Sequence, residues 1–533
     1  MKFLLFIRNA RQYLFPLVFL VLSSGVFFYN AYYFRSNLNL TPPGSLYSFA
    51  VGHSGDYYQY LYMIRRGQEG HILFHNAYTE ANVPDVILQP YYHIIGWLSR
   101  PLALSPIYVY LIAHLVSLAV FLACVFFLID VFCPKTVTKI LAALFFFSAT
   151  GYWYLVSQGG SLLYTQDVVY SYYFDLLDKF LVIPPHHLLA LSLSIIAIIL
   201  LARRRGTLVI SGIAGILFAL VGFLHPWMQA IFLACVTVVM FIQLLMERNR
   251  ARFILQSWII IMALSVPVLL ITLRSLPKTD AVLGLFVVQP RTISFLQYVT
   301  ALGPLFIPAV FVLFFRRLLA KNLILCAWAF VPIALFFLPD ARMPMDIFRL
   351  FQIYQHIPMA ILAALALEEI TKKLRLPSLV LLGIGILFGI YGYTSFTWML
   401  KDNMAVNTNF YNYYIPKWFL TMAAYLDRTA PDSVVLAGTT VSSMIPAFTH
   451  NKVILGHDGN QIHYAQKRDE AYSFFYQTMP TGDIKEYIRG SRANYIVLGV
   501  DIPGWSDLPY ASLPFFTTVY TDSPVSVVRV GLP

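Results

Sequence analysis

A multi-pass α-helical membrane protein with a small α/β domain at its C-terminal end is the fold class that the sequence predicts. Hydrophobic residues make up 59% of the 533 residues and charged residues only 12%, whereas soluble domains contain about 45–50% and about 25%. Apolar runs of roughly 20 residues, the length that crosses a bilayer, recur along most of the chain. From about residue 404 short strands and helices alternate instead. We therefore expect a membrane domain over residues 1–403 and an α/β domain over residues 404–533.

The basic character of the chain fits membrane topology better than nucleic-acid binding. The net charge is +12, but the basic residues cluster in short gaps between apolar runs, as they do in cytoplasmic loops. Membrane lipids are expected as partners and nucleic acid is not. The four cysteines lie in or beside apolar runs without a CxxC motif, so neither a disulfide nor a zinc site is expected.

About eleven membrane spans are predicted. The first, residues 12–34, follows a basic N-terminal segment and is too long for the apolar part of a signal peptide, so an uncleaved helix with a cytoplasmic N-terminus is expected. Basic clusters occupy alternate gaps on the side of the N-terminus, which predicts an outward C-terminal domain and an inner or plasma membrane location. The ten further runs are residues 106–131, 137–156, 187–202, 207–224, 227–246, 254–273, 301–315, 322–338, 348–368 and 377–399.

The loop between the first two spans, residues 35–105, is too polar and aromatic to be a simple connection. Asp56 opens a stretch with Tyr57, Tyr58 and Tyr60 whose aromatic side chains suit a helix lying at the membrane interface. A general base must be an ionisable group within reach of the hydroxyl or amine that it deprotonates. Asp56 is therefore the candidate base and the tyrosines are candidate cavity residues; a solvated carboxylate and an interfacial aromatic belt are the alternatives.

Two further outward segments carry ionisable residues. Asp167 lies in the gap before the fourth span, the pair His186 and His187 stands where the chain re-enters the membrane, and His225 precedes a Pro-Trp turn. Ionisable groups at membrane depth are costly and tend to be functional, so all four are candidate cavity residues. Alternatively, the histidine pair merely lies at the membrane interface, and His225 only forms a hydrogen bond to a backbone group left without a partner at the proline. Histidine and aspartate can bind a divalent metal, but no ligand spacing here is diagnostic.

Arginines on the outward side are candidates for binding phosphate. Arg349 lies just inside the tenth apolar run, Arg342 is nearby, and Arg291 is a weaker candidate. The planar guanidinium group holds phosphate oxygens through two parallel hydrogen bonds. The alternative is an arginine that extends to the interface to reach water.

The last 130 residues show the pattern of a small α/β domain. The Gly438-Thr439-Thr440 turn between a strand and a helix lacks both GxGxxG and GxxxxGK[ST], so it is interpreted as an ordinary connection rather than a cofactor site. Helices are expected over 416–427, 464–478 and 481–490, strands over 433–437, 453–455 and 495–498, and a hairpin from 517–520 and 525–530.

Several of these motifs together resemble the GT-C superfamily of polytopic glycosyltransferases, which includes aminoarabinose transferases, protein O-mannosyltransferases and oligosaccharyltransferase catalytic subunits. In that superfamily an acidic motif follows the first span. Many members have a second acid beside the first, where this chain has Tyr57. Either Asp167 takes that second role or no residue does, and whether a divalent metal takes part stays open. The motifs that carry the resemblance are Asp56 to Tyr60, Arg66-Gly67, Gln89-Pro90-Tyr91-Tyr92, Arg349 with Pro358 to Ala364, and Tyr425-Leu426 with Ser433 to Ala437 and Gly456-His457.

The resemblance implies an inverting sugar transfer on the extracytoplasmic side. The donor would be a sugar on a polyprenyl phosphate or diphosphate, and the acceptor a lipid, a glycan or a protein. Asp56 would deprotonate the acceptor, and Arg349 would stabilise the departing phosphate. A flippase or other transporter of lipid-linked sugars and a non-catalytic envelope assembly protein are the competing functions. A transporter would distribute charges through its spans, whereas here the polar residues gather in outward loops, which favours the enzyme.

Overall fold

The computed structural model consists of two compact units, each built from several stretches of the chain. The helical unit comprises Met1–Tyr33, His114–Leu273 and Val288–Val406, and the sheet unit comprises Phe34–Ala113, Arg274–Val287 and Asn407–Pro533. The structure describes residues 2–49, 54–149, 154–158, 161–165, 183–203, 207–275, 295–337, 350, 353–391, 414–457, 461, 463–476, 478–499 and 513–531.

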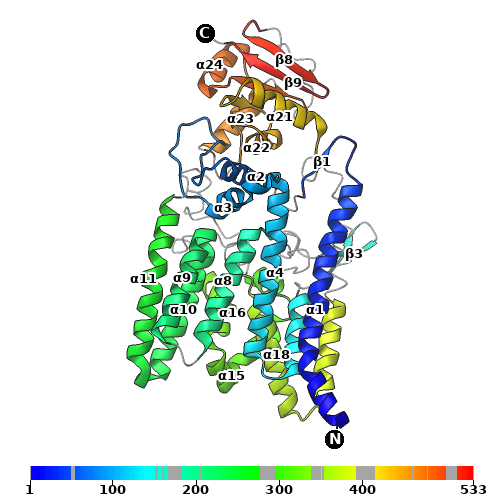
Figure 1. Cartoon of the computed structure of the whole chain (residues 1–533), viewed down its shortest axis with the longest axis vertical. Coiled ribbons are helices and arrows are strands. Elements are labelled where there is room, and N and C mark those ends of the chain that lie inside the picture. Colours follow the sequence, from blue (N-terminus) through cyan, green and yellow to red (C-terminus); the bar gives the residue numbers. More distant parts are fainter. Residues whose placement is uncertain are drawn as a thin grey trace. The chain divides into compact units, whose positions relative to one another are not determined.

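Long apolar helices dominate the helical unit (Figure 1). Among the described residues five helices are long and apolar enough to cross a membrane, namely Tyr13–Asn39, Pro106–Phe132, Pro185–Ala202, Pro226–Met246 and Arg248–Ser275. Four shorter apolar helices cover Thr136–Ser148, Leu208–Leu224, Leu323–Phe336 and Leu379–Tyr391. The helices of this unit include α1 (Lys2–Asn39), α4 (Pro106–Phe132), α5 (Thr136–Ser148), α8 (Pro185–Ala202), α9 (Leu208–Leu224), α10 (Pro226–Met246), α11 (Ala251–Ser275), α16 (Leu323–Phe336) and α18 (His356–Lys373).

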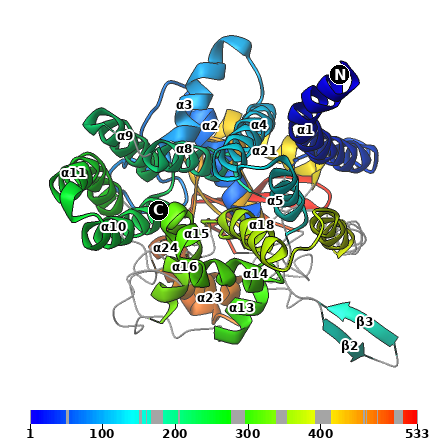
Figure 2. The ribbon, with the colours of Figure 1, turned by 90° about the horizontal axis from the view of Figure 1, so that it is seen from below.

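Helices that follow one another in the chain pack side by side in this unit. Seen end-on, α8, α9, α10 and α11 stand as neighbours (Figure 2), and α9 contacts both α8 and α10 while α10 also packs on α16. Prolines set two of the boundaries, because Pro185 and Pro226 occupy first helical positions, where the missing N–H costs nothing.

Three predicted spans differ from the structure. The expected span 348–368 is not helical at residues 353–355, where Tyr354 has a φ of +52°, and α18 begins only at His356. Residues 301–315 are not one helix but parts of α13 (Phe295–Leu302), α14 (Phe306–Val310) and the 3₁₀ turn η3 (Phe311–Phe314), followed by α15 (Arg316–Lys321). Gly303 ends α13 with a φ of +70°, and the proline after it cannot donate a helical hydrogen bond. The expected span 137–156 ends early, at Ser148, and its last residues form strand β2 (Tyr154–Gln158), which pairs with β3 (Ser161–Thr165). The Tyr-Leu-Val sequence there favours a strand.

The sheet unit is organised around a mixed five-stranded sheet in the order β6-β5-β7-β9-β8. Strand β5 pairs in parallel with β6 and β7, while β9 pairs antiparallel with β7 and β8. The predicted strand 495–498 and the terminal hairpin are confirmed. The strands are β5 (Val434–Leu436), β6 (Lys452–Val453), β7 (Tyr495–Leu498), β8 (Phe516–Asp522) and β9 (Val525–Val530).

The two faces of this sheet belong to two different hydrophobic cores. Successive side chains of a strand point to opposite faces, so Val435 and Val497 join one core while Leu436 and Leu498 join the other. Helices α23 (Tyr464–Phe475) and α24 (Thr481–Ser491) cover the second face. The first face is covered by α21 (Lys417–Thr429) and α22 (Thr439–Phe448).

Helix α2 (Ser54–Gln68), which comes from the loop after the first span, belongs to the core of the first sheet face. It packs on α22 and on α3 (Pro90–Ser99), and Tyr58, Met63 and Ile64 are at most 1% exposed. The expectation of a helix lying at the membrane interface is therefore wrong for its aromatic side chains, which are buried within protein. Strand β1 (Leu46–Tyr47) adds a second connection by pairing antiparallel with β4 (Tyr414–Ile415).

A pair of glycines sets the close approach of α2 and α3. A Cβ atom placed on Gly67 would lie 2.2 Å from the His93 carbonyl oxygen, and one placed on Gly96 would lie 2.1 Å from the Ile64 carbonyl oxygen. Both obstacles are backbone atoms, which cannot move aside as a flexible side chain can. The two helices can therefore pack this closely only with glycine at each crossing position.

We expect Gly96→Ala to destabilise the protein by about 1–3 kcal/mol, the usual cost of overpacking a tight interior. Thermal unfolding of the detergent-purified protein measures this change. Gly490→Ala is the matched control, because nothing lies within 4 Å of a Cβ at this position in α24, so its unfolding temperature should be unchanged or higher. Equal effects of the two substitutions would contradict the close helix crossing.

Candidate functional site

Asp56 lies in the first turn of α2 and contacts a histidine from the C-terminal segment of the chain. Its Oδ1 atom is 2.6 Å from Nε2 of His457, and the two residues are 401 positions apart. The Asp56 side chain is 45% exposed, whereas that of His457 is only 14% exposed. The positive end of the helix dipole favours a negative charge in this first turn. The site thus holds a carboxylate that solvent can reach, with a largely buried imidazole on one oxygen.

The backbone that carries His457 is held by the loop after the first span. At the end of β6 the Val453 N–H donates to the Ala77 carbonyl at 2.9 Å. Three residues later a Cβ on Gly456 would lie 2.6 Å from Cδ1 of Tyr78, so only glycine fits against that ring. The Tyr78 ring then meets the His457 ring edge-on, with centroids 6.3 Å apart.

A network of polar side chains also holds the segment that carries His457. The buried Gln461 accepts a hydrogen bond from the Gly456 N–H at 3.4 Å and donates to Glu80 at 3.5 Å. Glu80 also pairs with Lys467 at 2.6 Å, and both side chains are less than a fifth exposed. Residues of the first loop and of the C-terminal segment therefore fix the position of His457 together.

Tyr57, Tyr58 and Tyr60 are buried in the aromatic core of the sheet unit. The Tyr57 hydroxyl donates to the Ser48 carbonyl, and the Tyr60 ring stacks on that of Tyr92 with centroids 4.3 Å apart. Burial, together with neighbouring phenols, raises the pKa of Tyr57 well above its usual value, so the hydroxyl stays protonated. The structure gives these side chains a packing role, and their role in a substrate cavity stays a prediction.

Arg65, in the last turn of α2, holds this helix against α22. Its Nη2 atom donates to the carbonyl oxygens of Pro446 and Thr449 at 3.0 and 2.5 Å, at the C-terminal end of α22. These carbonyls lack partners within the helix, and a cation there also complements the helix dipole. Burial lowers the pKa of Arg65, although the Glu69 carboxylate 3.8 Å away opposes the shift. The guanidinium therefore connects the helix that bears Asp56 to the sheet.

The three predicted histidines of the helical unit lie together. The rings of His186 and His187 are 4.4 Å apart between centroids, and His187 is equally far from His225. His225 caps α10, since its Nδ1 accepts the Met228 N–H at 3.0 Å. This is the backbone-satisfying role that the sequence left as one alternative. The other predicted site residues, Asp167, Arg291, Arg342 and Arg349, lie outside the described residues.

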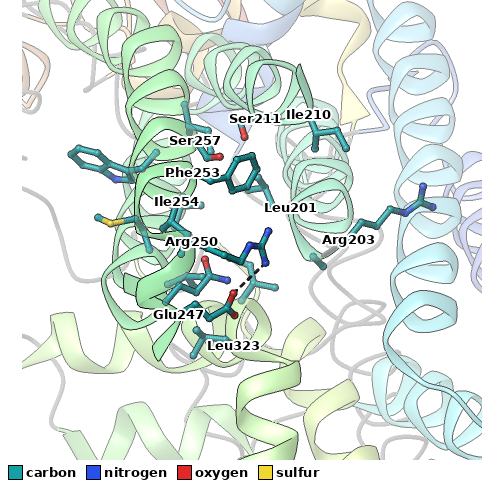
Figure 3. Close-up of a pocket in the computed structure, with 18 of the residues that line it drawn as sticks. Leu201, Arg203, Ile210, Ser211, Glu247, Arg250, Phe253, Ile254, Ser257 and Leu323 are labelled. Carbon is teal, nitrogen blue, oxygen red and sulfur yellow. Dashed lines mark hydrogen bonds and ion pairs between the residues drawn. The ribbon is translucent and has the colours of Figure 1, made fainter. Parts of the chain in front are cut away.

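A cavity of about 160 Å³ lies at the far end of α8 from these histidines (Figure 3). Leu201 and Ile210 line it, together with Arg250, which points into it toward Glu247 at 3.1 Å, whereas Arg203 points away. Arg250 and Glu247 therefore pair with each other there, and the lining contains none of the predicted site residues. Within the described parts of the chain, no three His, Cys, Asp or Glu residues are grouped so as to hold a metal ion.

Sequence reasoning singled out Asp56 but gave His457 no chemical role. The signal that points to it is its place directly after the apolar run Val453 to Leu455. In α/β sheets the carboxyl ends of parallel strands are where ligands gather, and β6 is parallel to β5. Histidine at such a position is therefore a candidate functional residue.

Comparison with solved structures identifies the fold. The oligosaccharyltransferase AglB from Archaeoglobus fulgidus, in complex with an inhibitory peptide and a dolichol-phosphate, matches with a TM-score of 0.56 and 14% identity over 92% of this chain and 69% of that chain. ArnT from Cupriavidus metallidurans, bound to undecaprenyl phosphate, matches with a TM-score of 0.52 and 12% identity over 97% of this chain and 98% of its own. No family profile and no curated protein matches the sequence.

A third structure extends the same likeness. The arabinofuranosyltransferase AftD from Mycobacteria matches 97% of this chain with a TM-score of 0.51 and 12% identity, although this chain covers only 41% of it. All three neighbours are GT-C glycosyltransferases, so the resemblance expected from the sequence is confirmed for the fold. At such low identity the likeness defines the fold class and leaves the chemistry to be argued from the residues.

Proposed function

We propose that this protein is a membrane glycosyltransferase that uses a polyprenyl-phosphate or polyprenyl-diphosphate sugar as donor, with Asp56 as its base. The observation that carries the proposal is the placement of Asp56, at the start of the helix after the first span in a GT-C fold, with one carboxylate oxygen 2.6 Å from His457 and the side chain 45% exposed. The neighbouring structures contain dolichol-phosphate or undecaprenyl phosphate, which supports a lipid-linked donor.

The chemistry is an inverting displacement at the anomeric carbon of the donor sugar. Asp56 takes the proton from a hydroxyl or amine of a lipid, glycan or protein acceptor while the acceptor atom forms its bond to the anomeric carbon. The bond from that carbon to the phosphate oxygen breaks, and the phosphate leaves with the electron pair. Arg349, with Arg342 and Arg291 as secondary candidates, stabilises the charge on that phosphate. Asp167, His186, His187 and His225 are proposed to line the substrate cavity.

The proposed topology has about eleven spans in the inner or plasma membrane. The N-terminus is cytoplasmic, residues 1–403 form the membrane domain with its large first outward loop, and residues 404–533 form an extracytoplasmic domain. In the helical unit α1 begins at the same end as α15, which carries Arg316, Arg317 and Lys321 (Figure 1). That arrangement supports a shared cytoplasmic side for these basic residues.

Replacing Asp56 by asparagine should lower the turnover number by about 10²–10⁴-fold, because the amide cannot accept the acceptor proton. The assay incubates the purified protein and an extract of membrane acceptors with a panel of undecaprenyl-phosphate and undecaprenyl-diphosphate sugars and measures the undecaprenyl phosphate or diphosphate released. Asp85→Asn is the control, since Asp85 is another first-loop acid that pairs with a histidine, His75. Wild-type turnover in Asp56→Asn would refute the assigned base.

Loss of the Arg349 guanidinium should weaken donor binding. A hydrogen bond to a charged group contributes about 1.5–3 kcal/mol, so Arg349→Ala should raise the Kd for the same donor by about 10–100-fold. Binding is measured with the catalytically disabled Asp56→Asn protein as background. Arg317→Ala, in the basic α15, should bind the donor as before. Unchanged donor affinity in Arg349→Ala would remove this arginine from the phosphate site.

Alkaline phosphatase fused after Pro533 should be active, because the enzyme folds only outside the cytoplasm and the C-terminus is proposed to lie there. The same reporter fused after Lys373, in a basic gap assigned to the cytoplasm, should be inactive. An inactive C-terminal fusion beside an active Lys373 fusion would contradict the topology, since it would invert every assignment of side.

A further inference from the structure

We propose that His457 positions the Asp56 carboxylate, so that the C-terminal segment completes the catalytic site; this rests on the proposed function. The imidazole acts through Asp56 and not on the substrate, which makes it a positioning residue. Its Nε2 donates to Oδ1 at 2.6 Å, the short distance of a charge-assisted hydrogen bond.

The need for such a residue follows from where Asp56 lies. Aspartate side chains in general occupy several staggered rotamers, and 45% of the Asp56 side chain is exposed. An acid that must meet the acceptor hydroxyl in one orientation loses rate if it occupies others, and a misplacement of about 1 Å can cost about 10²-fold. A hydrogen bond to one oxygen from a fixed donor selects a single orientation.

His457 is suited to be that fixed donor because its own position is determined from several sides. The Val453 amide is bonded to Ala77, Gly456 is in contact with the Tyr78 ring, and Gln461 accepts the Gly456 N–H. Its side chain is only 14% exposed. Ring packing and backbone bonds therefore restrict the position of the imidazole.

The other His–Asp pair of the first loop lacks these properties and provides a matched control. His75 lies 2.9 Å from Asp85, but the two side chains are 34% and 47% exposed. Exposed pairs of this kind contribute little to stability because water screens them. The same two residue types are thus present in the same unit with and without a buried, fixed donor.

The test compares His457→Ala with His457→Gln in the same release assay. Glutamine keeps an N–H donor near the position of Nε2 but cannot act as an acid or base at neutral pH. We expect alanine to lower kcat by about 10–100-fold, with the KM for the donor within about threefold of wild type, and glutamine to restore kcat to within about fivefold. A rise in KM with unchanged kcat, or equal losses in alanine and glutamine, would overturn the positioning role.

A double-mutant cycle separates positioning from general damage to the fold. If His457 acts only through Asp56, His457→Ala should cost nothing further in the Asp56→Asn background; additive losses would overturn the proposal. Gly456→Ala, which shifts the backbone of His457 while keeping its imidazole, should lower kcat as His457→Ala does, and wild-type kcat in this variant would count against it. His75→Ala should retain wild-type kcat, and an equal loss there would contradict a role special to His457.

Two outcomes distinguish this inference from the proposed function. If the wild-type protein releases undecaprenyl phosphate or diphosphate and His457→Ala retains its kcat, the role of His457 falls and the glycosyltransferase stands. If the wild-type protein turns over none of the donors, both fall. If His457→Gln instead regains activity only when Mn²⁺ is raised, His457 is a metal ligand and the hydrogen-bonding role is overturned.

Discussion

The burial of α2 against one face of the C-terminal sheet is the constraint on which the site depends. Tyr58 and Met63 of α2 share one apolar core with Val435 and Val497 of the sheet. At about 25 cal/mol per Å² of buried apolar surface, large aromatic and aliphatic side chains closed off in this way hold the helix firmly. Arg65 fixes its direction by bonding the end of α22. The sheet therefore places the helix that carries Asp56.

This shared core changes what the C-terminal segment contributes. The composition changes near residue 404, yet the compact sheet unit also includes Phe34–Ala113. Strand β1 pairs with β4, and the Val453 amide is bonded to Ala77. Each of these contacts joins the first loop to the last third of the chain. The loop that carries the candidate base is thus folded into the domain that follows the spans.

Hydropathy and local sequence predicted most of the elements but not how they meet. Spans bounded by proline, such as the helices that begin at Pro185 and Pro226, agree with the expected ranges to within a few residues. The run 301–315 misled because hydropathy ignores the left-handed turn that Gly303 makes. The aromatic residues of α2 led to the wrong expectation of an interfacial helix, because tyrosine is common both at membrane interfaces and in buried cores. Asp56 could be singled out as a candidate because its signal is local, whereas the His457 contact spans 401 positions and depends on tertiary packing.

The chemistry proposed for the site depends on an asymmetry between its two side chains. A base must be accessible to its substrate. An accessible side chain, however, can also adopt orientations in which it does not reach the acceptor proton. In the Asp56–His457 pair the carboxylate, which is 45% exposed, is accessible to substrate. The imidazole, which is only 14% exposed, is proposed to hold that carboxylate in one orientation. Gly456 makes this arrangement possible, because any larger residue would collide with Tyr78. A glycine, a tyrosine and a histidine of the sheet unit thereby support the proposed orientation of an acid in the first turn of α2.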